Sequence, residues 1–287
     1  SRLRERIAGL PDQYQQAWEE GLAMELPKAY AGAQAVVLLG MGGSAIGGDL
    51  VAGLAELEEA PPIHVVRDYT IPSWVGPKTL VIASSYSGNT EETLSAYQQA
   101  LKRGLFLMAM TSGGVLAQEA ANSRRPLFII SYQGEPRSAL GYSFMVPLAV
   151  TCRLGLLKDK ATEVSATTQL LRELASAFSP EVPEAQNLAK TIARAMHGRI
   201  PVMYGAGFLT AVARRWKTQL NENGKVWAFH EQLPELDHNA VAGYSSPVEA
   251  RERVYVMLLY SHLLHSRTSL RYQVTQELLL REEIAHR

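Results

Sequence analysis

Hydrophobic residues in the first half of this chain occur as short uninterrupted runs, separated by stretches in which apolar residues recur at helical spacing. The runs occupy residues 35–39, 63–66, 79–83, 105–110 and 127–130. Runs of four to eight residues rich in Val, Ile and Leu are typical of strands that are buried on both faces. Strands that alternate with helices favour a parallel sheet covered by helices on both sides. The pattern therefore predicts an α/β fold.

The rest of the chain predicts further helices and a second unit of the same kind. Helical spacing is found at residues 1–30, 140–157, 162–198 and 209–220, and further strands are expected at 200–204, 226–230 and 254–259. A strand–Gly-x-Gly–helix pattern occurs at 39–42 and again at 204–207. We therefore predict two related α/β domains, 1–157 and 158–287, each a parallel sheet flanked by helices.

The second predicted domain looks smaller than the first. Its pattern yields about three strands where the first domain has five, and the chain stops at Arg287 within a charged stretch with helical spacing. We therefore expect the natural protein to continue beyond Arg287.

Composition narrows the class of protein. The 287 residues are 47% hydrophobic and 20% charged, which is typical of a globular protein, and 28 basic residues balance 28 acidic ones. This balance indicates neither a nucleic-acid partner nor an anionic membrane surface. No run approaches the roughly 20 apolar residues of a membrane span, and no signal peptide is visible, so a cytoplasmic location is expected. The single cysteine, Cys152, lies in an apolar run and is interpreted as a buried structural thiol.

A hydroxyl-rich turn at residues 84–93, Ser-Ser-Tyr-Ser-Gly-Asn-Thr-Glu-Glu-Thr, follows the third predicted strand and precedes a helix. Exposed backbone N–H groups and the positive end of the helix dipole favour an anion at such a place. The hydroxyls of Ser85, Ser87 and Thr90 add further donors. A simple helix cap needs only one hydroxyl, so the turn predicts a phosphate site rather than a cap alone.

A glycine-rich loop, Gly-Met-Gly-Gly-Ser-Ala at 40–45, follows the first predicted strand. It is similar to a dinucleotide-binding fingerprint, with Asp68 as a candidate ribose ligand. Loops at the carboxyl ends of two parallel strands can also converge on one ligand. A small phosphorylated ligand would use both this loop, through Ser44, and the hydroxyl-rich turn, whereas a dinucleotide explains only the first. We therefore expect no nucleotide cofactor.

Two charged residues are candidates for chemistry. Arg137 follows the fifth strand and is either a solvated loop arginine or one that faces the ligand where negative charge develops. Glu222 ends a predicted helix, with Gly224 as the expected terminating glycine. A carboxylate at the negative end of a helix dipole is poorly placed for stability, and its position suits a base that takes a proton from carbon.

Metal chemistry is not expected. His230 and His238 lack the spacing of the helical zinc motif, and the chain has one cysteine and no compact cluster of His and Asp. The chain also lacks the motifs of nucleotide hydrolysis and acyl transfer.

Several of these motifs together resemble a known family. The Gly42–Ser44 loop and the 85–92 turn resemble the sugar isomerase (SIS) fold. The further motifs Pro-Arg-Ser-Ala-Leu-Gly-Tyr at 136–142, Asn-Glu-Asn at 221–223 and Pro-Glu-Leu-Asp-His-Asn at 234–239 are similar to those of bifunctional phosphoglucose/phosphomannose isomerases. The resemblance spans nearly the whole chain.

This resemblance implies aldose–ketose isomerisation between glucose or mannose 6-phosphate and fructose 6-phosphate, without metal or cofactor. Glu222 would move a proton between C1 and C2, Arg137 would stabilise the enediolate, and His238, from the other subunit of a homodimer, would assist ring opening. The residues expected to bind the 6-phosphate are Gly43, Ser44, Ser85, Ser87 and Thr90.

The family also uses a lysine close to its C-terminus, and this sequence has none after Lys225, in keeping with the expected continuation of the chain. Two alternatives stay open from the sequence. One is a sugar-phosphate-binding regulatory protein of this fold without chemistry, and the other is an isomerase of a different sugar phosphate.

Overall fold

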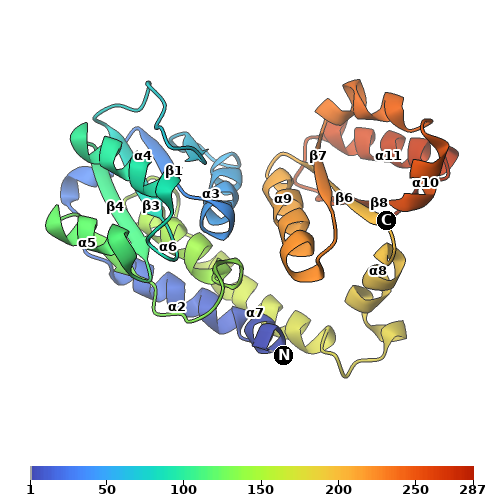
Figure 1. Cartoon of the computed structure of the whole chain (residues 1–287), viewed down its shortest axis with the longest axis horizontal. Coiled ribbons are helices and arrows are strands. Elements are labelled where there is room, and N and C mark those ends of the chain that lie inside the picture. Colours follow the sequence, from blue (N-terminus) through green and yellow to red (C-terminus); the bar gives the residue numbers. More distant parts are fainter. Residues whose placement is uncertain (1) are drawn as a thin grey trace. The chain divides into compact units, whose positions relative to one another are not determined.

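The computed structural model describes residues 2–287, which form two compact α/β units, the first extending to Ser176 and the second from Ala177 to Arg287 (Figure 1). Helix α7, Ala161–Ala177, falls almost entirely in the first of these compact units, which therefore ends later than residue 157, the predicted end of the first domain. The domain boundary predicted from the sequence stays a prediction. No helix in residues 2–287 has both the length and the apolar composition required to cross a membrane.

The first unit is built on a five-stranded parallel sheet with strand order β2-β1-β3-β4-β5. All five predicted runs form strands, and the central ones are buried on both faces, as expected for runs that are apolar at nearly every position. The strands are β1 Ala35–Leu39, β2 Ile63–Val66, β3 Thr79–Ser84, β4 Phe106–Thr111 and β5 Leu127–Ile129.

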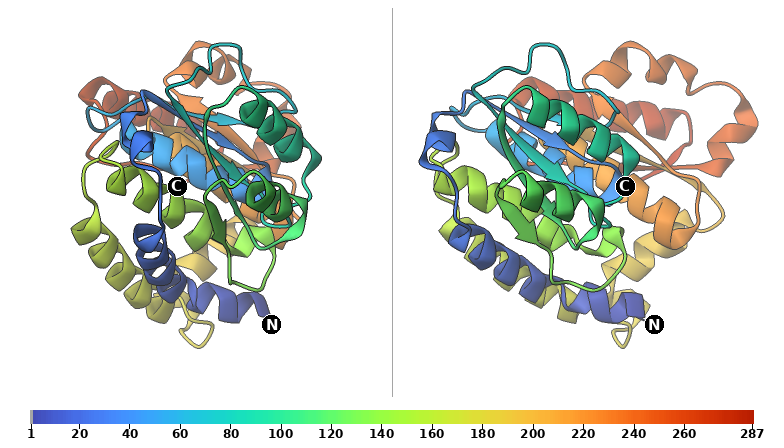
Figure 2. Two further views of the ribbon diagram at one scale, coloured as in Figure 1. Left: turned by 90° about the vertical axis from the view of Figure 1, so that its left-hand side faces the viewer. Right: turned by 60° about the vertical axis from the view of Figure 1, so that its left-hand side comes forward.

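Helices cover both faces of this sheet (Figure 2). Alternate strand residues such as Leu38 and Ile82 pack in one hydrophobic core with α2, α3 and α6. Their neighbours, including Val81 and Ala109, pack in a second core with α4 and α5. The helices of this unit, besides α7, are α1 Arg2–Ala8, α2 Leu10–Ala23, α3 Gly42–Ala55, α4 Glu91–Lys102, α5 Gly114–Asn122 and α6 Leu140–Arg153.

Helices α3 and α6 cross at backbone contact distance. A Cβ atom added to Gly47 of α3 would lie 1.8 Å from the carbonyl oxygen of Ser143 in α6, so only glycine fits at this crossing. Helix α6 ends at Arg153 and not at Leu157 as predicted, because Gly155 takes a left-handed conformation with φ of 71°. The crossing fixes the start of α6 against α3, directly after Arg137 in the chain.

The second unit contains a four-stranded parallel sheet with strand order β7-β6-β8-β9. Two parallel sheets, each flanked by helices, confirm the predicted fold class. The elements of this unit are α8 Leu188–Met196, β6 Ile200–Ala206, α9 Leu209–Gln219, β7 Phe229–Leu233, α10 Val248–Arg253, β8 Val254–Leu258, α11 Ser266–Arg281 and β9 Ala285–His286.

The structure corrects two sequence predictions in this unit. The chain does not stop inside a helix: α11 ends at Arg281, and β9 pairs with β8 as a fourth strand. The strand predicted at 226–230 lies three residues later, at Phe229–Leu233. The reason is that Val226 belongs to the preceding turn, where its carbonyl oxygen accepts a hydrogen bond from Asn221 Nδ2 at 2.9 Å.

Candidate active site

Two loops of the first unit meet at the point where the strand order reverses. Strands β1 and β3 are neighbours, and the crevice between the loops that leave their carboxyl ends is the usual ligand site of a sheet with this order. The backbone N–H of Tyr86, after β3, donates to Ser44 Oγ, after β1, at 3.1 Å. A Cβ atom on Gly40 would lie 2.9 Å from the Ser84 carbonyl oxygen, so the loops approach closely. Residues 40–44 and 84–90 contain the residues that the sequence predicts to bind phosphate, and for this predicted role we call them the phosphate-binding loops.

The hydroxyls of the second loop divide into two groups. Ser85 is 1% exposed, and its Oγ lies 2.9 Å from Thr90 Oγ1 and accepts from the Gly88 N–H at 3.1 Å. Ser87 is exposed, and its Oγ accepts from the Asn89 N–H at 3.2 Å, which leaves the hydroxyl proton available to a ligand. Ser85 therefore shapes the loop, whereas Ser87 faces the outside.

Two helix N-termini open onto these loops. Helix α4 follows Thr90 and helix α3 follows Met41, and neither residue makes a side-chain capping bond. Thr90 makes no capping bond because its hydroxyl is directed to Ser85. First-turn N–H groups have no partner within their own helix, so an anion can accept from them. Helix α5, by contrast, is capped by the loop, since Asn89 Oδ1 accepts from Val115 N–H at 3.0 Å.

Gly88 is required in the middle of the second loop. Its φ is 71°, in the left-handed region, and an added Cβ would lie 1.8 Å from the Gly113 carbonyl oxygen. The glycine lets this loop lie directly against the loop after β4.

The structure brings Arg137 to the start of α3. Arg137 lies in the 3₁₀ turn η2, Pro136–Ser138, which follows β5. A Cβ on Gly43 would lie 2.7 Å from the Pro136 carbonyl oxygen and 3.0 Å from the Arg137 nitrogen. Arg137 is half-buried and its backbone adjoins the loop that carries Ser44. The fully solvated interpretation of this arginine is therefore not supported.

A buried glutamine in α2 holds the other side of the same turn. Gln13 is 6% exposed, its Nε2 donates to the Ser138 carbonyl at 3.1 Å, and its Oε1 accepts from the Gly141 N–H at 2.6 Å. This role of Gln13 could not be predicted from the sequence, because no local pattern pairs a glutamine of α2 with backbone more than 120 positions away.

Asp68, the candidate ribose ligand of the dinucleotide alternative, and its neighbour Arg67 each make a contact within the protein. Arg67 forms an ion pair with Asp49 of α3, and the Asp68 carboxylate accepts from the Tyr69 N–H at 2.6 Å. A ribose-binding acid requires a carboxylate directed at the ligand, and Asp68 is used in its own turn. The geometry therefore favours a small phosphorylated ligand.

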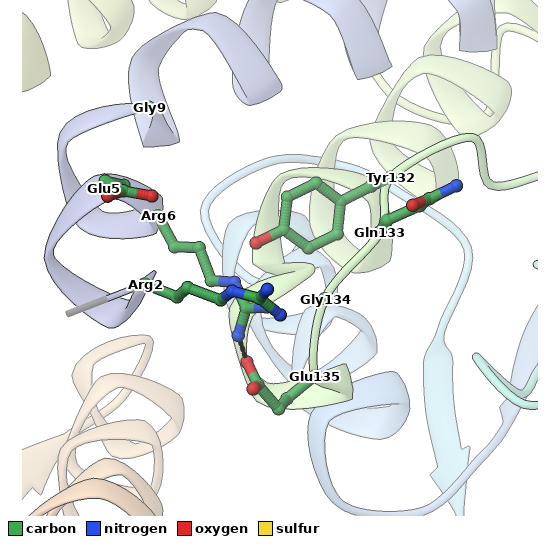
Figure 3. A pocket seen from close by; sticks show the side chains of 8 residues that line it. All are labelled: Arg2, Glu5, Arg6, Gly9, Tyr132, Gln133, Gly134 and Glu135. Carbon is green, nitrogen blue, oxygen red and sulfur yellow. Dashed lines mark ion pairs between the residues drawn. The ribbon is translucent and has the colours of Figure 1, made fainter.

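A cavity of about 720 Å³ lies between α1 and the segment after β5 (Figure 3). Arg2, Glu5 and Arg6 of α1 line one side of it and Glu135 lies on the other, where it forms an ion pair with Arg6. The charges balance, so the cavity offers no net field to an anion. In residues 2–287, the buried hydroxyl of Tyr132 beside this cavity has no hydrogen-bond partner.

Glu222 lies in a π-helical turn, Leu220–Gly224, that continues α9. Such turns are rare and occur frequently at functional sites. The left-handed residue that ends the turn is Lys225, with φ of 55°, and not Gly224 as predicted. Lys225 Nζ donates to the Glu222 carbonyl at 2.7 Å, so the cation itself closes the last turn. Glu222 is half-buried.

His238 ends a 3₁₀ turn, η5 Glu235–His238, after β7, and it is exposed. The turn is attached to α11 through Asp237, which accepts from Arg271 Nη1 at 3.0 Å and from the buried Thr275 hydroxyl at 2.9 Å. No local sequence pattern predicts this attachment.

Topology separates Glu222 from His238 within the second unit. Helix α9 connects the parallel strands β6 and β7, so its C-terminal end, with Glu222, lies at the amino edge of the sheet. His238 follows the carboxyl end of β7, whose five residues span roughly 16 Å. The two residues therefore lie at opposite ends of the strands of one sheet.

A second cavity, of about 300 Å³, lies on one face of the second sheet beside Tyr204 and Tyr244. The two hydroxyls are 2.8 Å apart, and burial raises the pKa of Tyr244 to about 12 and raises the pKa of Tyr204 further. Neither Glu222 nor His238 lines it. Among residues 2–287, no group of three or more His, Cys, Asp or Glu side chains is arranged to hold a metal ion.

Comparison with known proteins gives the chain its relatives. Residues 185–286 match the family described as the bacterial phospho-glucose isomerase C-terminal SIS domain. A bifunctional phosphoglucose/phosphomannose isomerase of Caldicellulosiruptor bescii is 38% identical over 96% of this chain and 81% of that protein. The protein of the same name from Aquifex aeolicus is 34% identical over 95% of this chain and 79% of its own length.

A solved structure shows the same fold. A hypothetical protein from Thermus thermophilus superposes with a TM-score of 0.72 at 19% identity, over 98% of this chain and 77% of that one.

Proposed function

This chain belongs to the family of bifunctional phosphoglucose/phosphomannose isomerases, and on that premise we propose that it interconverts glucose 6-phosphate or mannose 6-phosphate with fructose 6-phosphate. The observation that carries this proposal is the pair of phosphate-binding loops at the β1/β3 switch point, with the Arg137 turn packed against Gly43. A phosphate held there has two uncapped helix N-termini as donors. Its binding energy can position the reacting carbons at the other end of the sugar.

The chemistry needs one base, one stabiliser of negative charge and one group for ring opening. In our proposal the Glu222 carboxylate removes the proton from C2 of the aldose and returns it to C1, which gives the ketose. Arg137 stabilises the negative charge on the enediolate oxygens. His238 transfers a proton during opening of the ring. The sum of these steps moves one hydrogen from C2 to C1 and the hydroxyl proton from O2 to O1, so the atoms balance and no redox partner is consumed.

We further propose that the active protein is a homodimer with shared sites. Glu222 and His238 lie at opposite edges of the second sheet, so one unit alone does not bring them to one sugar ring. A second copy that supplies His238 removes this difficulty. The cytoplasmic location expected from the sequence stays part of the proposal.

Product analysis tests the activity. The protein is incubated with fructose 6-phosphate, and we expect both glucose 6-phosphate and mannose 6-phosphate to form. Binding of fructose 6-phosphate without either product would favour the regulatory alternative. Absence of both binding and turnover would point to another sugar phosphate.

A matched pair of variants tests the base. Glu222→Gln keeps the shape of the side chain but cannot accept the proton, so we expect exchange of the C2 hydrogen with deuterated solvent to fall at least about 10³-fold, with fructose 6-phosphate still bound. Glu252→Gln, at an exposed position of α10, is the control and is expected to exchange at the wild-type rate. Wild-type exchange in Glu222→Gln would exclude Glu222 as the base.

A further inference from the structure

Tyr86 connects four loops at the carboxyl edge of the first sheet. Its backbone N–H donates to Ser44 Oγ at 3.1 Å, and its carbonyl accepts from the Ser112 N–H at 3.0 Å and from the Ser112 hydroxyl at 2.6 Å. Its phenol extends away from both partners to the segment after β5. There the Tyr86 hydroxyl donates to the Tyr132 carbonyl at 2.7 Å and accepts from the Gly134 N–H at 2.9 Å.

The segment that Tyr86 reaches is the one that leads into Arg137. We call residues 132–135 the strap, because they connect β5 to the turn η2. The strap is bound from inside by the Tyr86 phenol at Tyr132 and Gly134, and from α1 by the ion pair between Arg6 and Glu135 (Figure 3). Two residues further on, Arg137 packs against Gly43.

We propose that Tyr86 is a positioning residue that couples occupancy of the phosphate-binding loops to the placement of Arg137. This inference rests on the proposed function for its catalytic consequence, because it assumes that Arg137 acts on the reacting carbons. Tyr86 does not touch those carbons in this account. Its backbone belongs to the second phosphate-binding loop, and its side chain binds the strap. A phosphate that orders this loop would therefore also order the strap.

The two ends of the connection are made by different parts of one residue, which makes them separable by mutation. Tyr86→Phe keeps the ring and the backbone bonds to Ser44 and Ser112 but removes both bonds of the phenol oxygen. The Gly134 N–H and the Tyr132 carbonyl then lose their partner in a half-buried place, and of the two attachments of the strap the ion pair between Arg6 and Glu135 remains. The substitution changes none of the backbone N–H groups or hydroxyls of the phosphate-binding loops that are proposed to bind the phosphate.

The chain offers a matched control in the same segment. The buried hydroxyl of Tyr132 has no hydrogen-bond partner in residues 2–287, so Tyr132→Phe removes a phenol oxygen without breaking a bond. The two variants make the same chemical change beside the same stretch of backbone. Only Tyr86→Phe breaks hydrogen bonds to the strap.

Steady-state kinetics with fructose 6-phosphate give the first test. We expect Tyr86→Phe to lower kcat at least about 10-fold with KM changed less than about 3-fold, because a misplaced charge stabiliser affects the transition state more than the ground state. Tyr132→Phe should stay within about 2-fold of wild type in both constants. A rise in KM with unchanged kcat in Tyr86→Phe would place the residue in phosphate binding alone and overturn the proposal. So would wild-type constants.

Hydrogen–deuterium exchange gives a second test that does not depend on turnover. Inorganic phosphate should slow exchange of the peptide containing residues 131–139 in wild type and in Tyr132→Phe, but not in Tyr86→Phe, where the Gly134 amide should also exchange at least about 10-fold faster without ligand. If phosphate leaves this peptide unchanged in wild type, the coupling does not exist, whatever the enzyme's activity. A wild-type protein that shows the coupling but no hexose phosphate turnover would instead contradict the proposed function alone.

Discussion

Replacing Gly43 with alanine tests whether Arg137 has to lie where the structure holds it. The new Cβ would meet the Pro136 carbonyl oxygen at 2.7 Å and the Arg137 nitrogen at 3.0 Å, and both are backbone atoms that cannot rotate away. Ordinary contact begins at about 3.4 Å, so the turn η2 has to recede from α3 by about 0.7 Å. The substitution therefore displaces Arg137 without removing any of its atoms.

The size of the effect follows from this displacement. A misplacement of about 1 Å at a reacting centre can cost about 10²-fold in rate, so about 0.7 Å should lower kcat between about 10-fold and 100-fold. This corresponds to about 1.4 to 2.7 kcal/mol of transition-state stabilisation. The protein should still fold, because alanine is favoured over glycine inside a helix by up to about 1 kcal/mol and Gly43 has no left-handed φ.

Kinetics and urea denaturation of Gly43→Ala and Gly48→Ala distinguish displacement of the Arg137 turn from a general loss of stability. Gly48→Ala lies in the same helix, and its new Cβ would meet only side-chain atoms of Leu38 and Val65, at 2.9 to 3.1 Å, which can shift. We expect Gly48→Ala to keep kcat within about 2-fold. If Gly43→Ala also keeps kcat within about 2-fold while urea unfolding shows a native fold, the position of the Arg137 turn does not limit the rate.

Three further predictions concern binding, packing and the thiol. Ser87→Ala removes an exposed donor to the phosphate and should raise KM for fructose 6-phosphate about 10-fold with little change in kcat; a loss of kcat at constant KM would contradict its proposed role. Gly47→Ala places a Cβ 1.8 Å from the Ser143 carbonyl oxygen and should lower the free energy of unfolding by about 3 kcal/mol or more in urea denaturation; wild-type stability would refute this crossing. The Cys152 thiol is half-buried and not fully buried as predicted, and its desolvation raises the pKa to about 11. Alkylation by iodoacetamide at pH 8 should therefore be far slower in the folded protein than in urea, and equal rates would contradict this shift. The same shift stabilises the fold below about pH 9, and this contribution is lost as the pH rises toward 11.

The central strands β1, β3 and β4 of the first unit could be predicted from the sequence because they are buried almost throughout. Every residue of β3 is buried, so its apolar run carries the whole signal. Strand β7 was misplaced because most of its residues are exposed or half-buried, and β9, with two residues, is too short for any periodicity. Where a strand lies at or near the edge of a small sheet, its sequence reflects the solvent as much as the core.

The site was predictable only in those parts that are local in sequence. The phosphate-binding loops are each a strand end, a glycine and a hydroxyl within about ten residues, and such a pattern can be recognised without a structure. The contacts of Gln13 with the backbone after Arg137, and of the Tyr86 phenol with the strap, join residues 46 to 128 positions apart. Propensity and periodicity contain no information about such pairs, because they are produced by the strand order.

The second phosphate-binding loop shows that counting hydroxyl residues in a sequence overestimates the number of side chains available to a ligand. Four hydroxyl residues, Ser84, Ser85, Ser87 and Thr90, precede α4, where a helix cap needs only one, and this excess singles out the loop. Ser84 and Ser85 are buried, and Ser85 is bonded to Thr90, so these side chains hold the turn in shape. Because Thr90 bonds to Ser85 and not to its own helix, the first-turn amides of α4 are left for an anion. In the proposed function, the extra hydroxyls therefore contribute to phosphate binding mainly by keeping the backbone donors open, and Ser87 is the hydroxyl residue of this loop that is exposed.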